Sequence, residues 1–238
     1  MVYKKRLNNR GFEELRKIEA KVGVIKRADG SAYFKMGETW AYAAVYGPRN
    51  LYPKFLQDPS RGILRCNYNM MPFSSSHGRV RPGGSRRAKE ISLVTEKALM
   101  PVLELEEYPN SVVDIFIEFP QTEAGSRCAG ICAASMALAD AGLTMKDMVT
   151  AVSVGKIGDK LLVDLDYSEE AFADAPVADI PVAYLHNSGK IVLLQMDGLA
   201  KKEDLSKLLD MAKKACNELY EIQKKALKSK YTETKVIE

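Results

Sequence analysis

The chain has 238 residues, of which 46% are hydrophobic and 28% are charged, and its formal net charge is +4. This length and composition are typical of a soluble globular protein with a substantial core. No apolar run reaches membrane-spanning length, and the polar first residues lack the core of a signal peptide, so we expect a cytoplasmic protein without membrane contacts. The mild positive charge permits nucleic-acid binding without requiring it.

The first half of the chain opens with a polar, basic arm over residues 1–17, and a meander of short strands follows. Alternating residues over 18–25 predict the first strand, and Ala28-Asp29-Gly30 predicts the turn into the next. The connection at 47–62 interleaves cations such as Arg61 with aromatic side chains. That composition suits single-stranded nucleic acid, and it suits an ordinary surface loop equally well. Further strands are expected at 31–36, 39–46 and 63–71.

A cationic stretch precedes the first predicted helix. Apolar residues at helical spacing follow it, so we expect a helix over 85–103 with Ser85 as its N-cap. Arg86 and Arg87 then fall in the first turn, where the helix dipole disfavours positive charge. A bound anion would explain both arginines, and the alternative is an ordinary basic loop.

A second helix is expected to begin directly after a buried strand. Residues 112–119 predict the strand, and small residues over 128–141 predict the helix. Gly125, Ser126 and Arg127 would then place backbone N–H groups, a hydroxyl and a guanidinium at a helix N-terminus, which suits a phosphate-sized anion. From these residues alone, a capped helix with a solvated arginine is equally acceptable.

The second half of the chain again alternates strands with a helix, and a long C-terminal helix from about Lys202 carries one apolar stripe. Two successive strand–helix halves indicate an α+β fold in which sheets and helices form layers. We expect one domain with pseudo-repeated halves at about 15–145 and 146–230, preceded by the basic arm 1–14. The strands of the second half are expected at 149–154, 160–165, 180–185 and 191–196.

An acidic segment at residues 163–180 follows one predicted strand and leads into another. Carboxylates clustered in one crossover can hold Mg²⁺ together with water and substrate phosphate, or they can transfer a proton. The alternative is an acidic surface loop.

Together these stretches resemble the RNase PH family, and within it the catalytic subunits of archaeal exosomes. Ser-Arg-Arg opens the earlier helix and Gly-Ser-Arg the later one, and the resemblance extends over residues 15–227. It implies a duplicated βαβα core of the ribosomal protein S5 domain 2-like fold. The family signature Arg-x-Asp-Gly-Arg is replaced by Arg6-Leu-Asn-Asn-Arg10, so we expect that element to be altered or missing. Further matching stretches are residues 22–33, 43–49, 68–74 and 178–183.

The resemblance implies phosphorolysis of RNA from its 3′ end, with release of nucleoside diphosphates. Inorganic phosphate, the co-substrate, would bind the Gly-Ser-Arg turn, and a separate set of cations would hold the RNA backbone. Phosphoryl transfer depends mainly on positioning and charge neutralisation, which suits a site of this kind. The implied phosphate ligands are Gly125, Ser126 and Arg127, and the implied RNA ligands are Arg86, Arg87, Arg61 and Arg65.

The family also carries two aspartates six residues apart, and these are implied to be catalytic and to hold Mg²⁺ or Mn²⁺. Asp179 matches the second aspartate. The first falls on Glu170 with about three extra residues intervening, or on Asp174. Both assignments stay open at this point.

The partners that the resemblance implies are single-stranded RNA, a related non-catalytic RNase PH-like subunit in a hexameric ring, and RNA-binding cap subunits. Two alternatives remain: a non-catalytic, RNA-binding ring subunit, and a stand-alone RNase PH that trims tRNA. The retained anion motifs and Asp179 argue against the first alternative, although the altered acidic segment favours it. The stretches at 46–49 and 68–74 favour the exosome subunit over the second.

Overall fold

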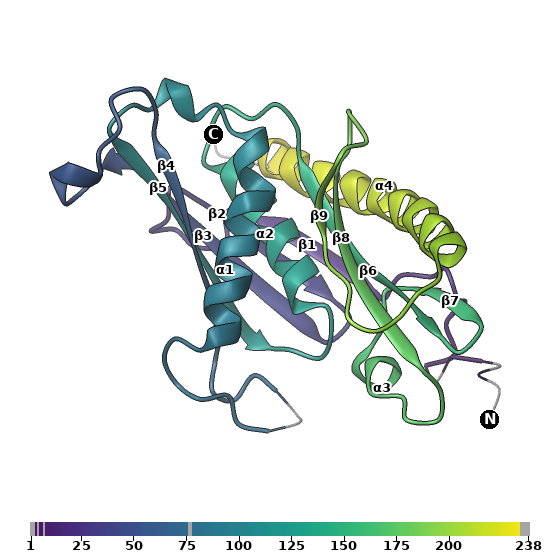
Figure 1. Ribbon diagram of the computed structural model, residues 1–238. Coiled ribbons are helices and arrows are strands. Elements are labelled where there is room, and N and C mark those ends of the chain that lie inside the picture. The colour runs from purple at the N-terminus through teal and green to yellow at the C-terminus, as the bar shows by residue number, and fades with distance from the viewer. Residues whose placement is uncertain (1–2, 4, 7, 76–77, 234–238) are drawn as a thin grey trace.

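The computed structural model describes residues 3, 5–6, 8–75 and 78–233 and contains two β-sheets with helices packed on them (Figure 1). The first sheet has five strands in the order β1-β2-β3-β5-β4, and the second has four in the order β7-β6-β8-β9. The predicted α+β fold is therefore confirmed. The strands are β1 (Ile18–Val22), β2 (Gly30–Met36), β3 (Thr39–Asn50), β4 (Ile63–Met70), β5 (Ser111–Gln121), β6 (Val149–Ile157), β7 (Lys160–Val163), β8 (Val177–Leu185) and β9 (Ile191–Leu194).

The helices differ in where they pack. The second helix contacts strands of both sheets, and the C-terminal helix contacts β6 and β1 from another side (Figure 1). The first helix joins β4 to β5, which are the only parallel pair among the described strands. The helices are α1 (Arg86–Leu99), α2 (Ser126–Asp140), α3 (Tyr167–Glu170) and α4 (Lys202–Glu233).

The central helix α2 is almost entirely buried, because small residues let both sheets approach it. It begins after Gly125, whose φ of 65° is left-handed, and Gly142 follows it with a φ of 75°. The first of these turns leaves the N–H groups of the first helical turn without a side-chain cap. The helix thus starts two residues earlier than the expected position, directly at the predicted anion motif.

Helix α1 begins at the predicted position and ends early. The hydroxyl of Ser85 accepts a hydrogen bond from the N–H of Ala88 at 3.0 Å, so the predicted N-cap is confirmed. The helix ends at Leu99, and a separate 3₁₀ turn at Met100–Val102 contains Pro101 near its start. The predicted end at residue 103 was wrong because the apolar spacing continues through this separate turn.

Packing between β2 and α2 should make Gly30 intolerant of any side chain. A Cβ atom at Gly30 would lie 2.2 Å from the backbone nitrogen of Ala141, where the helix ends. We expect Gly30→Ala to lower the free energy of unfolding by about 1–3 kcal/mol, measured by urea denaturation. Gly84→Ala is the matched control, because its Cβ would meet nothing closer than 3.9 Å. Equal midpoints for the two variants would contradict this packing.

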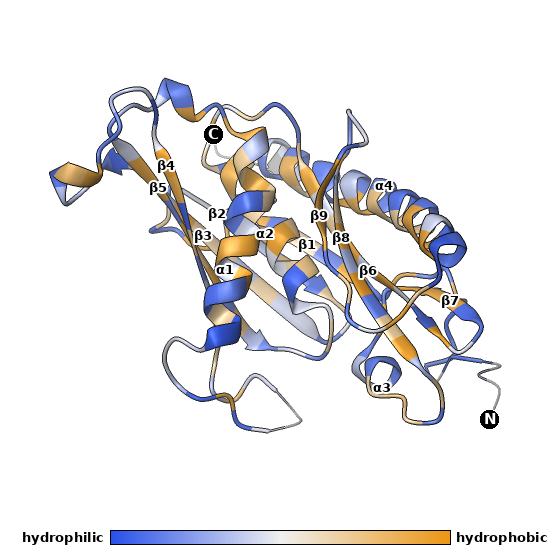
Figure 2. Ribbon diagram, in the orientation of Figure 1, coloured by the Kyte–Doolittle hydropathy of each residue, from blue (hydrophilic) through white to orange (hydrophobic). Residues whose placement is uncertain are grey.

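The C-terminal helix α4 is amphipathic along its 32 residues, and Figure 2 shows hydrophobic and hydrophilic residues alternating along it. Its predicted stripe is confirmed where Leu208, Ala212 and Leu219 are buried in the main core. Neither α4 nor any other helix in the described ranges is long and apolar enough to cross a membrane.

The N-terminal arm decides between the two forms of one expectation, that its signature is altered or that it is missing. Residues 1, 2, 4 and 7 of the arm lie outside the described residues, but Arg6 and Arg10 are placed and both bind the backbone oxygen of Asp164. Asn9 has a φ of 62°, which asparagine tolerates better than most residues. The altered signature is therefore not missing, since its two arginines are docked against the second half of the chain.

Candidate active site

A cleft of about 600 Å³ lies where the two sheets and α1 meet. The starts of α1 and α2, the short helix α3, and strands β6 and β8 all contribute to its lining. The structure brings six of the predicted residues together in it. These are Arg87, Gly125, Ser126, Arg127, Glu170 and Asp179.

The turn between β5 and α2 supplies the anion-binding side of the cleft. Ser126 is the first residue of α2, and its hydroxyl accepts a hydrogen bond from the hydroxyl of Tyr68 at 2.8 Å. The guanidinium of Arg127 pairs with Glu90 at 3.3 Å, and its buried Nε has no hydrogen-bond partner among the described residues. An anion at this helix N-terminus would meet free N–H groups, a hydroxyl and a cation.

Only one of the two arginines at the start of α1 lines the cleft. Arg87 lines the cleft, where burial raises the pKa of both Glu170 and Asp179 and the charge of Arg87 opposes part of that rise. Arg86 is exposed and does not line the cleft. The first turn of α1 holds no acidic residue, so an anion could approach both arginines.

Two carboxylates form the acidic side of the cleft. Glu170 ends α3, which is fixed by a capping box between Asp166 and Glu169. Burial, followed by the charge of Asp179, raises the pKa of Glu170 to about 7, while Arg16 and Arg87 oppose the rise. Burial also raises the pKa of Asp179, and the hydroxyl of Ser153, which donates a hydrogen bond to it, opposes that rise.

Four predicted residues lie away from the cleft lining. Asp174 is exposed, and of the two open candidates for the companion acid only Glu170 lines the cleft. Arg61 pairs with Asp58 at 3.3 Å. Arg65 also lies outside the lining and pairs with Asp114 at 2.7 Å. The fourth residue, Arg86, is exposed and outside the lining as well.

The sequence did not point to several residues that line the cleft, namely Tyr167, Ser153, Gln195 and Asp197. Asp197 reaches it because its backbone pairs with that of Asp179 in both directions, each at 2.8 Å. Ser153 lies on the strand next to β8. A serine or an aspartate in an ordinary strand pattern gives no local signal, so only strand register could have placed these residues.

The carboxylates also bear on metal binding. Within the ranges that the structure describes, no three His, Cys, Asp or Glu side chains are grouped so as to hold a metal ion. Mg²⁺ is nevertheless commonly bound by one or two carboxylates plus water and phosphate oxygens. Because burial raises the pKa of both Glu170 and Asp179, a cation there would relieve an unfavourable pair of charges, and the pair fits that mode of binding.

Family models match most of the chain. Residues 14–144 match "3' exoribonuclease family, domain 1", and residues 147–215 match "3' exoribonuclease family, domain 2". The anion-binding turn lies in the first region, and both cleft carboxylates lie in the second.

Individual relatives agree with these models. The exosome complex component Rrp41 of Methanopyrus kandleri is 46% identical over 226 residues, covering 95% of this chain and 93% of the relative. That of Pyrococcus furiosus is 48% identical over 227 residues, covering 95% and 89%. A solved structure of the Archaeoglobus fulgidus exosome with RNA bound to the active site has a TM-score of 0.77 at 25% identity, covering 91% of this chain and 92% of that one. Rice Rrp46 has a TM-score of 0.81 at 20% identity, covering 93% and 100%, and it supports the fold alone.

Proposed function

The chain belongs to the RNase PH family of 3′ exoribonucleases, and we propose that it shortens RNA by phosphorolysis as the catalytic subunit of an archaeal-type exosome. The observation that carries this proposal is one cleft that joins an anion-binding turn to two half-buried carboxylates. Inorganic phosphate is the co-substrate used by the family. The extensive identity to Rrp41 proteins supports the exosome assignment.

In this reaction an oxygen of inorganic phosphate attacks the last phosphodiester of the RNA. A new P–O bond forms, the bond from that phosphorus to the 3′ oxygen of the preceding nucleotide breaks, and a nucleoside diphosphate leaves. Gly125, Ser126 and Arg127 hold the attacking phosphate by N–H, hydroxyl and guanidinium groups. Both reactants are anions, so cations that neutralise them supply most of the catalysis.

The departing 3′ oxygen needs a proton, and Glu170 is our candidate donor. Its pKa of about 7 keeps a fraction protonated at neutral pH, which is where a general acid works best. Asp179 accepts a hydrogen bond from the Ser153 hydroxyl and is the second carboxylate of the cleft, beside Glu170. Asp179, together with Glu170 when Glu170 is deprotonated, would also hold a divalent cation, which when bound would offset negative charge on the phosphates.

The arginines of α1 hold the RNA backbone in this proposal. We expect Arg86→Ala with Arg87→Ala to weaken RNA binding equally for all sequences, because phosphate contacts carry no base information. The slope of log affinity against log salt should fall by about 1.4, or about 0.7 for each lost contact with a single strand. Filter binding at several salt concentrations measures both effects.

The matched control for this double variant is Lys225→Ala with Lys228→Ala, which removes the same charge from exposed positions on α4. A selective loss for some base sequences would show that the α1 arginines read bases. Equal losses in the two double variants would show only a general effect of net charge.

A projecting loop is a second place for RNA. Tyr52 and Phe55 are 67% and 84% exposed, and the turn at Lys54–Leu56 extends away from the first sheet (Figure 1, dark blue at the left). Exposed aromatic rings can stack on bases of a single strand, and Arg61 lies in the same connection. Arg61, and Arg65 on the adjoining strand β4, remain proposed RNA ligands outside the cleft.

We infer that the chain works in a ring with a related RNase PH-like subunit, with RNA-binding cap subunits, in the cytoplasm. Strand β9 is an edge strand, and exposed apolar side chains lie on it and just beyond it: Leu194 is 48% exposed, Met196 52% and Leu199 89%. Such an edge is prone to aggregate unless another chain covers it.

The deciding experiment incubates the purified chain, alone and with its ring partner, with 5′-labelled RNA, phosphate and Mg²⁺. We expect shortening from the 3′ end and release of nucleoside diphosphates that depends on added phosphate. Nucleoside monophosphates formed without phosphate would indicate hydrolysis instead. RNA binding without any shortening, in both preparations, would favour the non-catalytic ring subunit.

A further inference from the structure

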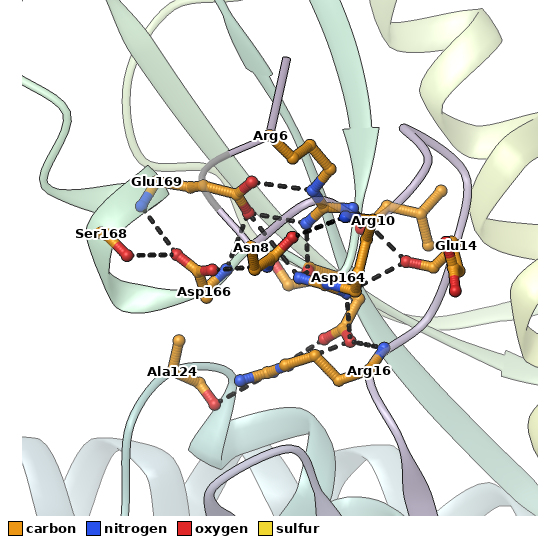
Figure 3. Close-up of polar contacts among 12 residues, drawn as sticks. Arg6, Asn8, Arg10, Glu14, Arg16, Ala124, Asp164, Asp166, Ser168 and Glu169 are labelled. Atoms are coloured by element: carbon orange, nitrogen blue, oxygen red, sulfur yellow. Dashed lines mark hydrogen bonds and ion pairs between the residues drawn. The ribbon is translucent and has the colours of Figure 1, made fainter.

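A buried polar network ties the N-terminal arm to the acidic segment that follows β7 (Figure 3). Arg6 is 2% exposed and Arg16 is 7% exposed, and the acids that they meet, Asp164 and Glu169, are fully buried. Buried charges are costly unless they are paired and hydrogen-bonded. This network is therefore part of the protein interior and differs from a set of surface ion pairs.

Arg16 grips Asp164 with three hydrogen bonds. Its Nε and Nη2 donate to the two carboxylate oxygens at 3.0 and 2.7 Å, and its backbone N–H donates at 2.7 Å. The N–H of Asp164 donates to the backbone oxygen of Ser153 at 2.7 Å, and the hydroxyl of Ser153 donates to Asp179. Arg16 therefore holds Asp164, Asp164 is hydrogen-bonded to Ser153, and Ser153 in turn supports the carboxylate of Asp179 in the cleft.

The same guanidinium also reaches the anion-binding turn. Nη2 of Arg16 donates to the carbonyl oxygen of Ala124 at 3.3 Å, and the hydroxyl of Thr39 donates to that oxygen at 2.7 Å. Ala124 directly precedes Gly125, where a Cβ atom would lie 3.1 Å from Nη2. Figure 3 shows Arg16 lying between Asp164 and Ala124.

The arm fixes the proton donor in a similar way. Glu169, the neighbour of Glu170 in α3, accepts hydrogen bonds from Arg6 at 2.6 and 2.7 Å and from Tyr3 at 2.8 Å. Glu169 cannot shift without breaking these bonds, so the position of Glu170 depends on the arm.

We propose that Arg16 is a positioning residue that fixes the anion-binding turn relative to the acidic segment, so that phosphate and the two carboxylates meet at one phosphodiester. This inference rests on the proposed function. Phosphoryl transfer depends on alignment, and displacing reacting groups by about 1 Å costs on the order of a hundredfold in rate. The arginine touches neither substrate in this account and acts through Ala124 and Asp164.

The test compares Arg16→Met with Arg10→Met. Arg10 also binds Asp164, at 3.3 Å through its side chain, but it makes no bond to Ala124, so it is the matched control. Calorimetric titration with inorganic phosphate alone should show about tenfold weaker binding for Arg16→Met and less than about twofold change for Arg10→Met. RNA affinity should stay within about twofold in both, because the α1 arginines are untouched.

In steady-state kinetics, the parameters for phosphate and for RNA should respond differently. Arg16→Met should raise KM for phosphate and lower kcat, while KM for RNA stays near that of the parent. Because phosphate binding is measured without RNA, it separates this inference from the proposed function. If the parent chain binds phosphate but releases no nucleoside diphosphate, the proposed function is contradicted. The effect of Arg16 on phosphate binding can still be measured in that case.

If Arg16→Met does not fold, because Asp164 loses a buried partner, Thr39→Val carries the test. It removes the other donor to Ala124 without burying an unpaired charge, and we expect phosphate binding weakened by about tenfold. Unchanged phosphate affinity in the folded variants would overturn the inference. Equal losses of phosphate and RNA affinity in both arginine variants would also overturn it, since the arm would then contribute only stability.

Discussion

Reversing the charge of Arg127 is expected to abolish phosphorolysis while the chain still folds and binds RNA. The guanidinium lies at the N-terminus of α2 with 21% of its side chain exposed, so a carboxylate there needs no repacking of the core. It would repel phosphate at a helix N-terminus where N–H groups and the helix dipole attract it. We expect Arg127→Glu to lower kcat/KM for phosphate by on the order of a thousandfold, measured by nucleoside diphosphate release at varied phosphate.

The matched control is Lys97→Glu, the same charge reversal at an exposed position on α1 outside the cleft lining. It should turn over like the parent. Circular dichroism should show both variants folded, and RNA affinity should fall much less than activity in Arg127→Glu because Arg87 remains. Normal turnover of Arg127→Glu at saturating phosphate would remove Arg127 from the phosphate site.

Helix starts could be predicted from sequence to within two residues because short-range chemistry decides them. A serine that caps an N-terminus and a glycine that takes a left-handed turn act within one turn of the chain, and both Ser85 and Gly125 lie where the helices begin. The end of α1 was missed because Pro101 starts a new 3₁₀ turn that continues the apolar spacing. The idea that the two halves are repeats of one unit stays a prediction.

The division of labour among the acids could not be predicted, because it depends on partners far away in the chain. Asp164 and Glu169 are occupied by arginines about 150 residues earlier, whereas Glu170 turns into the cleft and Asp174 faces solvent. Sequence spacing alone made several of these carboxylates equivalent candidates. The arm was undervalued for the same reason, since Arg16 carries no motif of its own.

Removing the cleft carboxylates one at a time should separate them from the acids that only support the fold. We expect Asp179→Asn and Glu170→Gln each to lower kcat by about 10²–10⁴-fold while phosphate and RNA still bind, because neither change removes a cation. Asp174→Asn is the matched control in the same segment and should turn over like the parent, since this residue is exposed and outside the cleft lining. Quantification of nucleoside diphosphates under single-turnover conditions measures all three.

The pH dependence assigns the role of Glu170 within that pair. Its pKa is raised to about 7, so the protonated form predominates below that pH and is lost above it. If Glu170 protonates the leaving 3′ oxygen, kcat at saturating phosphate should fall as pH rises through about 7, and Glu170→Gln should leave a low, flat profile over the same range. A kcat that rises through pH 7 in the parent would mean that the carboxylate form is the active one, as a cation ligand or a base.

If Asp179→Asn, Glu170→Gln and Asp174→Asn all degrade RNA like the parent, the acidic segment has no part in the chemistry, and the non-catalytic ring subunit becomes the better account of this chain.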